Sequence, residues 1–314
     1  MHHPIRPAVL GLTMCFLACR CLLAAERAAG PAGAAPQPPG QAAAKPESAP
    51  GPEPASVAWE SDYARAMGLA DRQKKMLVLY FFDPASPLCK RFEQETLVDA
   101  KVRRRLADFV CVRLPLDARI TQDDKQVVLL GHSAFGEMHA QPGLAMVDFG
   151  PGESRYHGCV VSTFPLGPRL FYGPGEVLTI LDLPHGTLSQ RTLIYAVRTH
   201  PERPASAAGV PDKRLLDEAE SHSQCQAQCC RQGHHNWESR FQRISGFMGC
   251  GVREVCAESW PGQDLVEAAV ECVHSWRCSP GHWGGVSAPT CAFGYDMKRG
   301  SNGVWYGTGV FAMR

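Results

Sequence analysis

The chain has 314 residues, of which 45% are hydrophobic and 20% are charged, and its 32 basic residues stand against 31 acidic ones. A chain of this length exceeds the usual size of one domain, so we expect two domains with separate cores. The net charge of +1 argues against nucleic acid or an anionic membrane surface as a partner selected by electrostatics.

The N-terminus has the layout of an export signal. His2 and Arg6 precede an apolar run over residues 7–23, and small residues follow it. The run is short for a membrane span and is interrupted by an arginine. We therefore predict a signal peptide over residues 1–26 and no transmembrane span in the mature chain, which places the protein in the periplasm or outside the cell. Lipid attachment at Cys19 is the alternative.

Residues 27–56 consist mostly of Ala, Pro, Gly and Gln. Such a segment buries too little apolar surface to offset its ordering entropy, so we predict a disordered spacer. Eight of the fourteen cysteines lie between Cys225 and Cys291. An oxidising compartment would permit disulfides there, although the sequence does not fix their pairing. Their spacing lacks paired CxxC knuckles, which argues against a structural zinc site made of cysteines.

The next stretch alternates helices and strands. A continuous apolar run over 76–82 fits a strand buried on both faces. The other predicted elements are helices at 60–74, 86–93 and 99–107, strands at 109–114 and 144–149, and a helical patch at 124–138. This order predicts an α/β sheet.

The order of these elements resembles the thioredoxin-like fold over residues 57–200. Ser86 to Cys89 stand where that family carries its CxxC motif, and Pro142 stands where it carries a cis-proline before a core strand. The resemblance implies that the last strands fall between about residues 159 and 183. It also implies a closing helix at 190–199.

The nucleophilic position of the family is occupied by Ser86. The family's first cysteine reacts because the helix N-terminus stabilises its thiolate. A serine hydroxyl is far less acidic and forms no mixed disulfide, so the dithiol exchange cycle is absent. Cys89 is a candidate for a monothiol role, or it simply packs at the start of the helix. We therefore expect a scaffold or binding module here.

Residues 201–212 contain three prolines and predict a linker. A helix over 212–232 follows, with His222 on its apolar stripe, where a hydrogen-bonded core histidine is a commoner outcome than a ligand. A second amphipathic helix ends at a Ser-Pro-Gly-His turn, 279–282. Two aromatic-rich runs then predict an antiparallel hairpin, and the unit is α+β.

These residues resemble the bacterial CAP superfamily, which includes cysteine-rich secretory proteins, over 213–314. Residues 276–282, WRCSPGH, match the family's tryptophan followed by SPGH. Residues 254–257, EVCA, match more loosely its Glu-Asn-Ile-Ala. The resemblance implies an α-β-α sandwich.

In many CAP domains two histidines and two glutamates face a central cavity, and some members bind a divalent metal there. The resemblance places His282, Glu254 and either His234 or His235 in that cavity, while the second glutamate has no match. His235, Glu254 and His282 are thus candidate zinc ligands. Glu254 could instead pair with Arg240 or Arg243.

We favour a non-enzymatic, exported two-domain protein whose CAP-like cavity binds a small molecule, a glycan or a partner protein. Its thioredoxin-like module would be redox-inactive. The alternatives are an oxidoreductase that uses Cys89 and a metal-dependent hydrolase at His282. No Gly-x-Ser-x-Gly motif is present.

Overall fold

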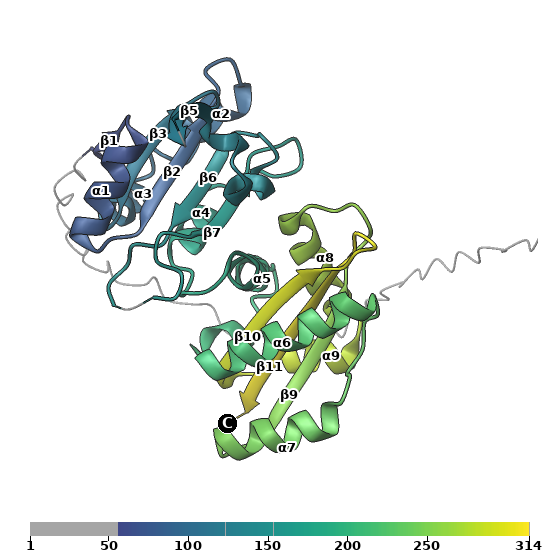
Figure 1. Ribbon diagram of the computed structural model, residues 1–314. Coiled ribbons are helices and arrows are strands. Elements are labelled where there is room, and N and C mark those ends of the chain that lie inside the picture. The colour runs from purple at the N-terminus through teal and green to yellow at the C-terminus, as the bar shows by residue number, and fades with distance from the viewer. Residues whose placement is uncertain (1–55, 123, 153, 314) are drawn as a thin grey trace, which may run out of the picture. The chain divides into compact units, whose positions relative to one another are not determined.

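The computed structural model describes residues 56–122, 124–152 and 154–313 (Figure 1). All described residues belong to one compact unit, residues 51–314. The predicted signal peptide, Cys19 and the predicted spacer up to residue 55 lie outside the described residues. Export and lipid attachment therefore stay predictions.

The first sheet has five strands in the order β1-β3-β2-β6-β7. β1, β3 and β2 are parallel, and β6 and β7 continue the sheet in antiparallel pairing. The strands are β1 (Trp59–Glu60), β2 (Leu77–Phe82), β3 (Val110–Pro115), β6 (Gly143–Val147) and β7 (Val160–Pro165). The helices around it are α1 (Tyr63–Gln73), α2 (Pro87–Glu95), α3 (Ala100–Leu106), α4 (Pro174–Leu181) and α5 (Leu188–Thr199).

The central strand β2 is buried on both faces, as its apolar run predicts. Leu77, Leu79 and Phe81 pack into one hydrophobic cluster, while Val78 and Tyr80 pack into another. Because successive side chains of a strand point to opposite faces, each face needs its own cover of helices. The α/β sheet predicted from the sequence is confirmed.

Three details of the prediction are wrong. The stretch expected to be helical at 124–138 holds the end of a hairpin, β4 (Arg119–Gln122) with β5 (Lys125–Val128), and two short 3-10 turns, η1 (Leu129–Gly131) and η2 (Ser133–Met138). Only one strand, β7, lies between residues 159 and 183, because Pro174 starts α4 there. The peptide bond before Pro142 is trans, like every peptide bond in the described ranges.

The second sheet has four strands in the order β8-β10-β11-β9. The predicted hairpin is confirmed as β10 (Thr290–Arg299) paired antiparallel with β11 (Trp305–Met313), and β9 (Val252–Glu258) pairs with the other edge of β11. The predicted linker contributes β8 (Val210–Pro211), which pairs with β10. The remaining helices are α6 (Lys213–Cys229), α7 (Trp237–Met248), α8 (Leu265–Arg277) and α9 (Pro280–Ser287).

Helices cover both faces of this second sheet. On one face, Leu215 of α6 and Ile244 of α7 pack with Val310 of β11. On the other face, Trp276 of α8 and Val286 of α9 pack with residues of the three long strands. The β-strands are thus held between two helical layers (Figure 1).

Two close contacts fix this arrangement. α6 lies directly on β10, since a Cβ on Gly294 would come within 2.1 Å of the Leu215 carbonyl carbon. Only glycine leaves room for a helix backbone at this distance. α5 contacts β7 of the first sheet and both α8 and β10 of the second. The buried Ser189 of α5 also donates a 2.7 Å hydrogen bond to buried Asp296 of β10.

Among the described helices, none has both the length and the apolar character needed to cross a membrane.

Candidate functional site

Three of the residues predicted for the CAP-like site come from separate elements. Glu254 lies on β9, His234 lies in the turn between α6 and α7, and His282 lies in the first turn of α9. Pro280 begins that helix, because its fixed backbone angle suits the first helical position. The Ser-Pro-Gly-His stretch therefore forms the start of a helix. His282, in its first turn, lies at the surface beside His234.

The centre of the site is the carboxylate of Glu254, whose side chain is 0% exposed. Its Oε2 lies 2.5 Å from a guanidinium nitrogen of Arg240, which is only 11% exposed. Its Oε1 lies 3.0 Å from Nδ1 of His234 and 3.6 Å from Nε2 of His222. A buried carboxylate is tolerated only when it is paired, and Arg240 provides this pairing, whereas Arg243 pairs with Glu218.

The carboxylate also sets the orientation of His234. Because a carboxylate accepts hydrogen bonds, the Nδ1 that faces it carries a proton, and in the neutral form of the ring the lone pair is then on Nε2. That Nε2 lies 3.4 Å from Nε2 of His282. The His234 side chain is 40% exposed. The result is a chain from a buried carboxylate through one imidazole to a second, at a surface that solvent reaches.

The neighbouring His235 does not join this chain. Its Nε2 lies 3.0 Å from the Arg231 carbonyl oxygen and 3.8 Å from Sγ of Cys229. Of the two histidines that the sequence left open, His234 is the one that contacts Glu254 and His282.

Two further side chains beside Glu254 escaped the sequence analysis as site residues. His222 is 2% exposed, as expected of a core histidine, and its Nε2 donates to the Gly233 carbonyl oxygen at 2.9 Å. Burial lowers the pKa of His222, so its ring is neutral at neutral pH. Cys256 is 1% exposed, and burial raises the pKa of its thiol well above the ordinary value. Because side chains alternate along a strand, residues 254 and 256 lie on the same face of it, and this spacing could have identified Cys256 as a neighbour of Glu254.

The predicted zinc set of His235, Glu254 and His282 does not fit the geometry. His235 faces Arg231, and His234 lies between Glu254 and His282 with one ring nitrogen toward each. A zinc ion needs at least three protein ligands that converge on one point. These three do not converge.

The thioredoxin-like part offers no exposed thiol at the family's reactive position. Ser86 is the N-cap of α2, and its Oγ accepts a 3.4 Å hydrogen bond from the Cys89 amide. Cys89 is 1% exposed, and its Sγ accepts a hydrogen bond from the Asp83 amide at 3.4 Å. Pro142 directly precedes β6 and is buried.

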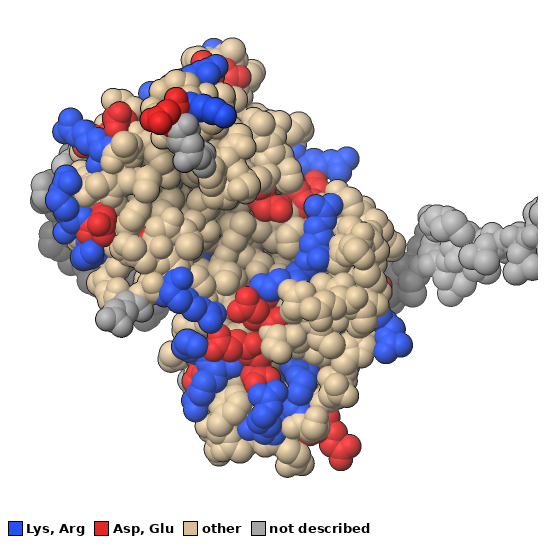
Figure 2. All heavy atoms as spheres, in the orientation of Figure 1, with Lys and Arg blue, Asp and Glu red and all other residues tan. Residues whose placement is uncertain are grey.

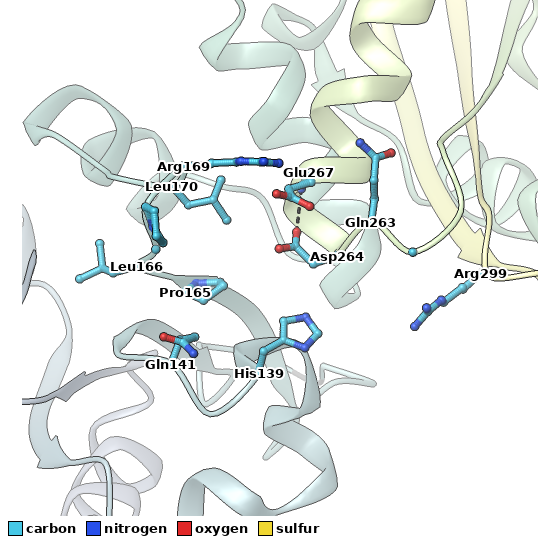
Figure 3. Close-up of a pocket in the computed structure, with 13 residues that line it drawn as sticks. His139, Gln141, Pro165, Leu166, Arg169, Leu170, Gln263, Asp264, Glu267 and Arg299 are labelled. Atoms are coloured by element: carbon cyan, nitrogen blue, oxygen red, sulfur yellow. Dashed lines mark hydrogen bonds between the residues drawn. The ribbon is translucent and has the colours of Figure 1, made fainter.

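A separate hollow of about 640 Å³ is lined by other residues of the same unit (Figure 3). His139, Gln141 and Arg169 line it from the first sheet's side, while Asp264 and Arg299 line it from the second sheet's side. Charges of both signs face it, and it contains none of the residues predicted from the sequence. It is a rival location for a ligand.

A family model described as Thioredoxin-like matches residues 58–148. Residues 58–148 form a thioredoxin-like domain. The match covers β1 through β6, whereas β7, α4 and α5 lie beyond it. None of the curated proteins searched matches the chain.

The ion pair between Glu254 and Arg240 predicts strong coupling in stability. Glu254→Gln or Arg240→Met alone leaves a buried charge without its partner, which costs about 3–5 kcal/mol. The double variant removes both charges, so we expect it to lose clearly less than the sum of the single losses. Urea unfolding of the four proteins measures this coupling.

The exposed pair of Arg91 and Glu95, whose side chains are 55% and 54% exposed, is the matched control. Its cycle should show little coupling, since exposed ion pairs contribute little. Additive losses at Glu254 and Arg240 would contradict the prediction.

Proposed function

We propose that this protein is an exported binding protein whose residues 213–314 form a CAP-like domain that binds its ligand at His234 and His282. The observation that carries the proposal is the 3.4 Å approach of the two Nε2 atoms. A glutamate whose side chain is 0% exposed holds one of these rings from behind. Residues that are fixed by buried partners and open to solvent on the other side are typical of a preorganised binding site.

The CAP-like assignment in this proposal rests on a sequence motif and on the layered arrangement of helices and strands. The WRCSPGH stretch carries the resemblance, and its histidine lies beside His234. The helices on both faces of the β8-β10-β11-β9 sheet agree with the sandwich that the resemblance implies. Glu254 takes the position of the glutamate in the family's Glu-Asn-Ile-Ala, although Val255 stands where the family has asparagine.

The chemistry of the two rings restricts the ligand. Burial, and secondarily the nearby His234, lowers the pKa of His282, which favours a neutral imidazole at this member of the pair, one that offers hydrogen bonds rather than charge. Such a pair suits hydroxyl groups, as in a glycan or a small polyol, or a polar side chain of a partner protein. Basic and acidic side chains lie interspersed on the face shown in Figure 2, which agrees with a partner that is not selected by charge.

The thioredoxin-like domain serves in this proposal as a redox-inactive interaction module. Ser86 replaces the nucleophilic thiol, and Cys89 is 1% exposed. The two alternatives, an oxidoreductase that uses Cys89 and a metal-dependent hydrolase at His282, gain no specific support from the distances at either site.

The ligand proposal predicts the effect of His282→Ala. The histidine side-chain NMR signals of the full-length protein are followed while soluble oligosaccharides and polyols are added. We expect perturbation of His234 and His282 by a binder and at least a tenfold loss of affinity in His282→Ala. His274→Ala, on the exposed side of α8, is the control and should retain affinity.

Binding that perturbs His139 at the rival hollow and survives His282→Ala would contradict the proposal.

The redox-inactive module predicts slow alkylation of Cys89. Only a thiol that solvent reaches can meet iodoacetamide, so Cys89 should react at least tenfold more slowly than the exposed Cys225. Mass spectrometry of peptides after timed labelling measures both rates in one sample. Cys89 as the first cysteine to be labelled would restore the oxidoreductase alternative.

A further inference from the structure

The hollow of about 640 Å³ that Figure 3 shows is lined by four charged side chains. Asp264 and Glu267 line it from the start of α8, and Arg169 and Arg299 line it from two other segments. None of the four forms an ion pair within the described ranges 56–122, 124–152 and 154–313. Their charges are therefore available to a ligand, and the volume is typical of a site for a small molecule.

Glu267 leaves the cap of its helix incomplete. Asp264 is the N-cap of α8, and its Oδ1 accepts a 2.8 Å hydrogen bond from the Glu267 amide. In a complete capping box the side chain of the third helical residue returns to the N-cap amide, as Gln190 does to Thr187 at α5. The Glu267 carboxylate makes no such bond. Figure 3 shows it beside the Asp264 carboxylate, and both point to the side on which Leu170 lies.

Both walls of the hollow are held by their own hydrogen bonds. The side-chain oxygen of Gln263 accepts from the Trp260 amide at 2.9 Å, and its carbonyl oxygen accepts from Nε1 of Trp305 at 3.2 Å. On the opposite wall, Gly167 and Leu170 exchange two backbone hydrogen bonds of 2.9 and 3.1 Å. Binding between fixed walls costs little ordering of the protein, which favours affinity.

The depths of the charges restrict the ligand further. Asp264 and Glu267 are half-buried, whereas Arg169 and Arg299 are exposed. An anion alone would meet the two carboxylates, and a cation alone would meet the two guanidinium groups. The ligand that suits both therefore carries both charges and keeps them apart. In a free amino acid the two charged groups share one carbon atom, whereas in a peptide the chain separates them.

We propose that this hollow binds a short peptide with two free termini and apolar side chains. Its ammonium group pairs with the carboxylates of Asp264 and Glu267. Its terminal carboxylate accepts charge-assisted hydrogen bonds from Arg169 or Arg299, whose planar guanidinium groups match a carboxylate. Its apolar side chains pack on the prolines and leucines of the loop 165–170, which form the facing wall.

The inference goes beyond the proposed function and does not rest on it. The two sites share no residue, because His234 and His282 are absent from the lining of the hollow. They also select different chemistry. The histidine pair suits uncharged hydroxyl groups, whereas the hollow suits a molecule with a charge at each end.

Isothermal titration calorimetry of the full-length protein with the dipeptide Leu-Leu tests the inference. We expect one peptide bound per chain. Acetylation of the amino terminus should weaken binding at least about tenfold, because it removes the charge that pairs with the carboxylates, and amidation of the other terminus should weaken it similarly. A wild type that binds no Leu-Leu, or that binds the doubly blocked peptide equally well, would overturn the inference.

Glu267→Gln locates the peptide. This variant should bind Leu-Leu at least about tenfold more weakly and bind the acetylated peptide as the wild type does, because that peptide has no ammonium group. Glu271→Gln is the matched control, since Glu271 is half-buried on α8 one turn later and does not line the hollow. Unchanged affinity of Glu267→Gln for Leu-Leu would contradict the inference. His282→Ala should keep the peptide, so the two proposals can fail separately.

Discussion

The charge of Glu254 is the constraint on which the second half of the chain depends. Its carboxylate is fully shielded from water and so must be matched by Arg240 and by the ring of His234. This requirement ties β9, α7 and the turn after α6 together at one point. It also fixes which nitrogen of His234 points outward. The pairing that the buried carboxylate needs for stability therefore determines that Nε2 is the ring nitrogen that faces His282.

Much of the fold could be read from the sequence because its strongest patterns are local. The apolar run of β2, the periodicity of α6 and α8 and the hairpin of β10 and β11 depend on neighbours in the chain. The hairpin at 119–128 could not be recognised, since its short, exposed strands lack an apolar alternation. β8 looked like linker because its two residues form a strand only through β10, some eighty positions later.

The site could be predicted only in part, because its contacts join residues that lie far apart in the sequence. The WRCSPGH stretch led to His282 and, through the family resemblance, to Glu254, and the structure joins them through His234. The choice between His234 and His235 depends on a turn whose geometry no spacing reveals. His222 was read as a core histidine, which it is, but its position behind Glu254 follows from the packing of α6 on the sheet.

The properties of the site depend above all on the fixing of the His234 tautomer by Glu254. Long-range proton–nitrogen NMR correlation of the imidazole rings in the metal-free protein tests this claim most directly. We predict that His234 carries its proton on Nδ1, in a hydrogen bond to the buried carboxylate, while Nε2 is unprotonated. A proton on Nε2, or a ring that averages between both forms, would contradict it.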